Sequence, residues 1–224
     1  MTRYGMVVDL NRCVACTGCV AACAVYHNLP NGILWNKVVY SEEGRFPGVR
    51  RLQMPKACQQ CDNTPCVKVC PTGATYKRAD GIVMVDYSKC IGCKYCVAAC
   101  PYDARSFLAN ITPWYDSGFT SLENLSPNQQ AGVAQKCTFC ADKIDAGVKA
   151  GSTPGVDRNA TPACVNTCPV GARYFGDLDD PNSNVSQIIA SSRAQQLLPD
   201  LGTQPKVYYI PLTKSVTAKG VLPT

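Results

Sequence analysis

The stretch "KCIGCKYCVAACP", Lys89 to Pro101, places four cysteines within eleven residues. They are Cys90, Cys93, Cys96 and Cys100, and a proline follows the last of them. Thiols spaced this closely along a helix-like segment are poorly placed for disulfide bonds with one another. The stretch therefore predicts a ligand-binding loop, and it raises the question of whether all four thiols serve one site.

The same arrangement recurs along the chain, because its sixteen cysteines sort into four groups of four. The stretch quoted above is group three. The other groups are Cys13, Cys16, Cys19 and Cys23 (group one), Cys58, Cys61, Cys66 and Cys70 (group two), and Cys137, Cys140, Cys164 and Cys168 (group four). Three groups end in Cys-Pro, whereas group one has Ala24 in place of the proline. Group four is split by an insert between Cys140 and Cys164.

Composition bounds the class of protein. A chain of 224 residues with 46% apolar residues fits one or two globular domains. Its apolar runs are far shorter than a membrane span, and its N-terminus lacks the apolar core of a secretory signal, so we expect neither feature. The net charge of +6 is scattered along the chain, which favours a solvated surface over a nucleic-acid site.

The spacing of the cysteines indicates iron–sulfur clusters. Disulfide scaffolds are typical of short secreted chains, and zinc sites need only two Cys-x2-Cys pairs. A third cysteine at the same spacing, then a fourth followed by proline, is the pattern of bacterial ferredoxins, in which the fourth cysteine ligates the other cluster of a pair. Sixteen thiols at four per cluster predict four 4Fe-4S clusters. With a single histidine in the chain, a Rieske centre, copper and nickel are disfavoured.

Around the cysteines, a short strand precedes a loop and a short helix carries the last cysteine. We expect one hairpin in 72–86, turning at Asp80-Gly81, and a second between 33–41 and 48–55. Polar residues from Thr112 to Gln135 indicate an insertion or surface loop. A capped helix is expected in 177–198, a last strand in 206–212, and a loose tail or arm in 213–224.

The chain carries no motif for another kind of chemistry. It has no Gly-x-Gly-x-x-Gly, no phosphate-binding loop and no nucleophile–base pair. His27 is interpreted as a polar loop residue rather than a cofactor contact. Four lysines flank the cysteines and either raise cluster potentials or are simply solvated; they are Lys89, Lys94, Lys136 and Lys143.

Longer motifs resemble a known family. They include "MVVDLNRCVACTGCVAAC", "CQQCDNTPCVKVCPTGAT", "KCIGCKYCVAACPYDAR", "QKCTFCADKI" and "ACVNTCPVGARYFGDLDDPNS". Over about residues 3 to 210 the chain resembles the four-cluster ferredoxin-type iron–sulfur (beta) subunits of the dimethyl sulfoxide reductase superfamily of molybdopterin oxidoreductases. It is most similar to the small subunits of respiratory arsenate, polysulfide, thiosulfate and tetrathionate reductases.

The resemblance implies an α+β fold with two pseudo-symmetric ferredoxin-like 2×(4Fe-4S) domains carrying hairpin and loop insertions. One domain would comprise residues 1–48 plus 125–180, with groups one and four. The other would comprise 49–124, with groups two and three and the loop insertion. Residues 181–224 would add a C-terminal helix, strand and tail.

The resemblance also implies which cysteines share a cluster. Site 1 would comprise Cys13, Cys16, Cys19 and Cys168. Site 2 would comprise Cys58, Cys61, Cys66 and Cys100. Site 3 would comprise Cys90, Cys93, Cys96 and Cys70, and site 4 would comprise Cys137, Cys140, Cys164 and Cys23.

In such complexes a large partner subunit holds molybdenum or tungsten on a bis-pterin cofactor and performs the chemistry. The resemblance therefore implies a non-catalytic electron-transfer subunit that serves this partner and a quinone-linked membrane anchor or a soluble carrier. A self-standing polyferredoxin is the alternative. Periplasmic location by co-export with the partner is favoured, and a cytoplasmic location is the alternative.

Overall fold

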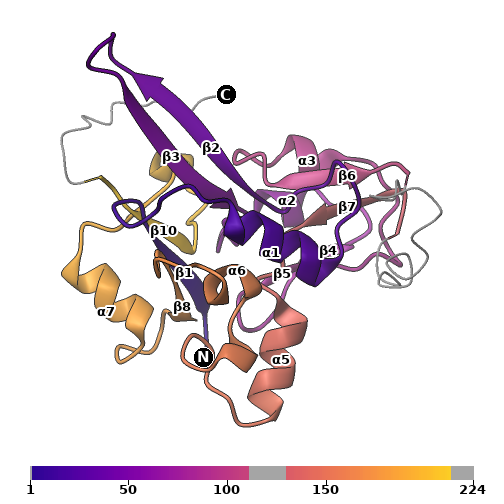
Figure 1. Ribbon diagram of the computed structural model, residues 1–224. Coiled ribbons are helices and arrows are strands. Elements are labelled where there is room, and N and C mark those ends of the chain that lie inside the picture. The colour runs from indigo at the N-terminus through magenta and orange to yellow at the C-terminus, as the bar shows by residue number, and fades with distance from the viewer. Residues whose placement is uncertain (1, 111–129, 213–224) are drawn as a thin grey trace, which may run out of the picture.

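The computed structural model describes residues 2–110 and 130–212 of the chain. Short strands alternate with short helices throughout, and the strands form one four-stranded sheet and three two-stranded ones within these residues (Figure 1). The fold is thus mixed α and β, as predicted.

The largest sheet joins both ends of the described chain. Its strand order is β8-β1-β10-β9. Strand β1 (Tyr4–Asp9) pairs parallel with β10 (Val207–Ile210) and antiparallel with β8 (Arg173–Asp177), while β9 (Gln195–Gln196) pairs with β10. The predicted first and last strands both form, and they are neighbours. The strand that follows group four is therefore held beside the strands near both chain ends.

The core beside this sheet reaches the cysteine loops. Val7 and Val8 of β1 and Phe175 of β8 are almost completely buried. The ring of Phe175 stacks on Tyr4 at 5.4 Å and meets Phe139 edge-on at 5.3 Å. Since Phe139 lies between Cys137 and Cys140, burial of apolar surface by the sheet also fixes the loop of group four.

Both predicted hairpins form. Strand β2 (Asn36–Glu43) pairs with β3 (Arg50–Ala57), and this long hairpin projects from the body of the molecule (Figure 1). Strand β4 (Thr75–Lys77) pairs with β5 (Val83–Val85). Gly81 adopts a φ of 80° in the second turn, a conformation that glycine adopts without strain.

Short helices follow the cysteine loops. Those that carry cysteines are α1 (Gly18–His27), α2 (Pro65–Lys68), α3 (Tyr95–Ala98) and α6 (Ala163–Asn166). The others are α5 (Ala141–Lys149), α7 (Asn184–Ser191) and the 3-10 turns η1 (Arg158–Ala160) and η2 (Pro199–Leu201). Strands β4, β6 (Arg105–Leu108) and β8 each begin five residues after the last cysteine of a group. This repetition fits the expected pseudo-symmetry, which remains a prediction.

Three sequence-based expectations are wrong in part. A short helix carries the last cysteine only in group one; in the other groups the helix ends two residues before it. The predicted loop 112–135 ends in a strand, β7 (Val133–Lys136), whose residues are buried and pair with β6; residues 111–129 lie outside the described part of the chain. The predicted helix 177–198 is only α7, capped by the Ser183 hydroxyl, which accepts from the Ser186 N–H at 3.2 Å. The chain then continues into β9.

The predicted tail 213–224 lies outside the described residues. Among the helices of the described ranges, none has the length and hydropathy needed to cross a membrane.

Candidate cluster-binding sites

Four cysteines from groups two and three line one hollow. Cys58, Cys61 and Cys66 of group two surround it together with Cys100 of group three, which follows α3 by two residues. The hollow measures about 350 Å³ including its mouth. This is the set predicted for site 2. It brings the last cysteine of one group to the first three of another.

A second hollow has the same character in the other pair of groups. It measures about 330 Å³ and is lined by Cys137, Cys140 and Cys164 of group four and by Cys23. Cys23 reaches it because α1 carries this side chain, buried, on its inner face. This is the set predicted for site 4. Each hollow is lined by four thiols, the ligands that iron–sulfur clusters use.

The two remaining sites are more exposed. In site 1, Cys13 lies close enough to Cys19 and to Cys168 for their charges to interact. In site 3, Cys96 likewise lies close enough to Cys90 for their charges to interact. Cys16 and Cys93 are the exposed members of these sets. The described contacts leave the assignment of Cys70 to site 3 a prediction.

The cysteine loops hold unusual backbone conformations. Residues other than glycine with positive φ include Ala15, Thr17, Lys94, Phe139 and Cys140, with values between 55° and 63°. Each costs of order 1–3 kcal/mol unless its surroundings hold it there. Left-handed residues in a loop are one way of turning backbone N–H groups toward an anion, and here the Phe139 N–H donates to Cys137 Sγ at 3.4 Å. The strain therefore lies where a thiolate-bound cluster would need N–H donors.

The buried thiols crowd one another. Burial, with the neighbouring Cys58 thiol, raises the pKa of Cys61 to about 12. Burial likewise raises the pKa of Cys137 to about 12, with Cys164 and Cys58 adding to the shift, and raises that of Cys23. So many thiols cannot ionise together without a compensating positive charge. Bound iron would supply that charge, since metal binding to thiols releases their protons.

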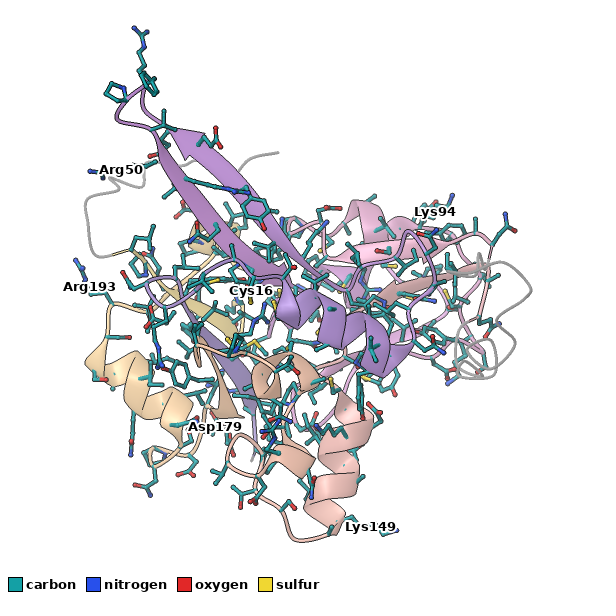
Figure 2. All side chains as sticks on the ribbon, viewed as in Figure 1. Cys16, Arg50, Lys94, Lys149, Asp179 and Arg193 are labelled. Atoms are coloured by element: carbon teal, nitrogen blue, oxygen red, sulfur yellow. The ribbon has the colours of Figure 1, made fainter. Side chains whose placement is uncertain are left out.

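Hydrogen bonds hold the loop of group one from outside. The Gln53 side chain of β3 donates to the carbonyl of Cys13 at 3.1 Å, and the buried Asn36 of β2 donates to the carbonyl of Cys19 at 3.0 Å. The long hairpin therefore acts as a brace on site 1. Figure 2 shows Cys16 at the base of this hairpin and Lys94, the neighbour of Cys93, on another part of the molecule.

His27 is a contact that the sequence analysis missed. It is the last residue of α1 rather than a loop residue, and its Nε2 lies 3.2 Å from Cys140 Sγ. Its ring packs against Trp35 at 4.6 Å. The signal was its spacing: His27 follows Cys23 by four residues, which places both on one helix face.

Buried cations accompany the thiols. Of the four flanking lysines, Lys136 is buried, with its amine bonded to the carbonyls of Val83 and Cys137, whereas Lys89 and Lys94 are exposed. Lys143, half-buried, lies 5.7 Å from the Tyr26 ring centroid. Two arginines that the sequence analysis did not single out are also buried; they are Arg105 and Arg173.

Thiols of different predicted sites lie close enough at three places for their charges to interact. Cys96 of site 3 interacts with Cys66 of site 2. Cys137 of site 4 interacts with Cys58 of site 2. Cys164 of site 4 interacts with Cys19 of site 1. These three adjacencies are the ones expected if the predicted ligand sets lie in a row, 3–2–4–1, with the exposed sets at the two ends.

Comparison with known proteins agrees with this chemistry. Two descriptions of a 4Fe-4S dicluster domain match residues 49–113 and 89–172, and a 4Fe-4S binding domain matches 10–26. The chain is 42% identical to a putative dimethyl sulfoxide reductase iron–sulfur subunit of Halobacterium salinarum, over 94% of this chain and 79% of the relative. It is 41% identical to a selenate reductase subunit of Mesobacillus selenatarsenatis, over 93% and 72%. It is 40% identical to the arsenate respiratory reductase iron–sulfur subunit of a Shewanella species, over 93% and 96%.

Proposed function

Since the chain belongs to the family of iron–sulfur subunits of dimethyl sulfoxide reductase-type enzymes, we propose that it is the electron-transfer subunit of a respiratory-type reductase. It would bind four 4Fe-4S clusters, and these supply one-electron transfer when bound. The partner that performs the chemistry would be a large subunit with a molybdenum or tungsten bis-pterin cofactor. A quinone-linked membrane anchor or a soluble carrier would stand at the other end.

The observation that carries the proposal is the crossing of cysteines between groups. Cys100 lines the hollow of group two, and Cys23 lines the hollow of group four. Each crossing ties two ligand sets together, so neighbouring sites are held at short range by covalent chain. A relay of electrons needs this closeness, whereas separate structural metal sites do not.

The chain's own residues would perform three tasks. The sixteen thiols hold the iron as sites 1 to 4, with the memberships stated above. The inward-turned N–H groups of the loops stabilise the negative charge that reduction adds. The buried walls of sites 2 and 4 keep water from the middle of the row, while the exposed Cys16 and Cys93 mark its ends.

The ligand assignment can be tested with Cys100 and Cys70, the two cysteines proposed to bind the cluster of another group. Cys100 lines the hollow of site 2, whereas the place of Cys70 in site 3 rests on the sequence alone. In the purified complex we expect about sixteen irons per chain. Cys100→Ser should perturb the spectroscopic signal that Cys58→Ser also perturbs. Cys70→Ser should perturb the signal that Cys90→Ser perturbs. If each variant instead tracks the other members of its own group, the crossing is wrong; zinc in place of iron would refute the cluster proposal altogether.

The partner is tested by isolation under native conditions. We expect the chain to co-purify with a larger subunit that contains molybdenum or tungsten. A stable monomer that holds all its iron and has no large partner would favour the self-standing polyferredoxin. The location of the complex is expected to follow the large subunit. If the large subunit carries an export signal, the complex would lie in the periplasm. If the large subunit carries no such signal, the complex would lie in the cytoplasm.

A further inference from the structure

Two arginines occupy matching positions in the repeat. Arg105 closes "CPYDAR" after group three and Arg173 closes "CPVGAR" after group four, each five residues beyond the last cysteine. Each begins the strand that follows, β6 or β8. Both residues are only 5% exposed. The repeat thus places one buried guanidinium in each pair of groups.

Arg105 lies between sites 2 and 3. It lines the hollow of site 2 and lies close enough to interact with Cys66 of that site and with Cys96 of site 3. Its Nη1 donates to Thr75 Oγ1 at 3.1 Å. Its Nη2 is buried and has no hydrogen-bond partner among the described residues. Buried N–H groups in folded proteins almost always have a hydrogen-bond acceptor, so this one indicates that a further acceptor binds nearby.

Arg173 occupies the equivalent place between sites 4 and 1. Its Nη1 lies 3.6 Å from Cys164 Sγ of site 4, and the guanidinium interacts with Cys19 of site 1. Its Nη2 donates to the buried Asn36 Oδ1 at 3.0 Å. Asn36 therefore orients Arg173 as Thr75 orients Arg105.

Among the described residues, neither arginine is paired with a carboxylate. Within residues 2–110 and 130–212, none of the ion pairs involves Arg105 or Arg173. A guanidinium stays charged at any pH that proteins tolerate, and an unpaired buried charge is costly. The nearest groups that can carry negative charge are the thiols of two adjacent sites, and a cluster bound by four thiolates is anionic.

We infer that Arg105 and Arg173 are positioning charges that set the reduction potentials of the sites they separate, Arg105 for sites 2 and 3 and Arg173 for sites 4 and 1. The inference rests on the proposed function, because it assumes clusters at those sites. Reduction adds one electron and no proton to a site, which makes it more anionic. A fixed cation next to two sites favours that change at both. Each arginine thereby raises the potentials of both sites beside it.

The test is an anaerobic redox titration of the purified complex, followed by electron paramagnetic resonance. In Arg105→Gln we expect the reduced-to-oxidised ratio of two of the four clusters to fall at least tenfold at a fixed potential, which is about 59 mV for one electron. The other two clusters should be unchanged. In Arg173→Gln we expect the reduction ratio to fall at sites 4 and 1 and to stay unchanged at sites 2 and 3. Iron content is measured first on the wild type. A wild type without about sixteen irons per chain would contradict the proposed function, whereas a full iron content with unchanged potentials in the variants would contradict only this inference.

Arg105→Lys and Lys89→Gln complete the design. Lysine keeps the charge without the guanidinium fork, so Arg105→Lys should retain most of the wild-type potentials. If Arg105→Gln fails to assemble, recovery by Arg105→Lys with near-native potentials still supports the inference. Failure of both variants, or unchanged potentials in an assembled Arg105→Gln, overturns it. Lys89→Gln removes an exposed charge beside Cys90 that is paired with Asp86, and we expect no comparable shift because solvent screens that charge.

Discussion

His27 shows how a single side chain outside the cysteine groups reaches a candidate cluster site. Its Nε2 lies 3.2 Å from the sulfur of Cys140, and the ring is held by Trp35. A thiolate bound to iron has no proton to give, so in the assembled protein the imidazole must donate this hydrogen bond. Hydrogen bonds to ligand sulfurs favour the reduced, more anionic state. His27 is therefore expected to raise the potential of site 4.

His27→Phe tests this role at the scale of one residue. Phenylalanine keeps a ring against Trp35 but loses the N–H donor, so we expect the potential of site 4 alone to fall. Only the strengthening of this hydrogen bond on reduction changes the potential, and a strengthening of about 0.5–1.5 kcal/mol corresponds to roughly a two- to tenfold change in the reduction ratio. The measurement is a redox titration, with Tyr26→Phe as control, because the Tyr26 hydroxyl bonds Asp142 rather than a sulfur. Equal shifts in both variants would contradict the assignment.

At the scale of secondary-structure elements, an ion pair joins the β4–β5 hairpin to helix α5. Arg78, directly after β4, makes two parallel bonds to Asp145 on α5, at 2.8 and 2.6 Å. Arg78 also pairs with Asp80 in its own hairpin. The hydrogen bonds from Arg78 lower the pKa of Asp145. The β4–β5 hairpin of groups two and three is thus tied to the helix inside group four.

Asp145→Asn should weaken this tie by about 0.5 kcal/mol, because the carboxylate is half exposed and solvent screens the pair. Since the folded pKa is depressed, the stabilisation is fully present above the ordinary value of about 3.9 and is lost only as pH falls through the lower folded value. The loss should therefore be the same across neutral pH. Urea unfolding in a double-mutant cycle with Arg78→Gln measures it. Lys149→Gln, at the end of the same helix, serves as control. A coupling energy of zero between Arg78 and Asp145 would show that this ion pair does not stabilise the fold.

The elements also show what the sequence could and could not predict. Cysteine spacing predicted the four groups, and turn residues such as Asp80-Gly81 predicted the hairpin that β4 and β5 form. Strand β7 was missed because it is short and ends in the polar residues Gln135 and Lys136. These two are buried by segments distant in sequence: β6, with which the strand pairs, Trp35 against Gln135, and Val83 against Lys136. Arg105 and Arg173 were missed although each lies five residues after a Cys-Pro cysteine. This spacing marks their matching positions, but only the fold shows that both are buried beside thiols.

At the scale of the whole molecule, the proposed row of sites 3–2–4–1 has two open ends. The cysteines of sites 2 and 4 are mostly buried, whereas Cys16 in site 1 and Cys93 in site 3 are exposed. Each end also carries an exposed apolar residue inside its loop: Val14 is 61% exposed and Ile91 is 67% exposed. An exposed apolar side chain beside an exposed sulfur is suited to close contact with a redox partner. The two ends would then serve different partners.

Val14→Asp and Ile91→Asp test this division of the surface. A buried carboxylate at a protein contact is costly, so each variant should slow electron exchange with one partner at least tenfold and leave exchange with the other unchanged. The two half-reactions are measured separately by stopped flow on the purified complex: reduction by the electron donor, and reoxidation by substrate through the catalytic partner. Val148→Asp is the control, since this exposed residue of α5 lies on an element outside the cysteine loops. Slowing of the same half-reaction by both variants would show that one end of the row serves both partners.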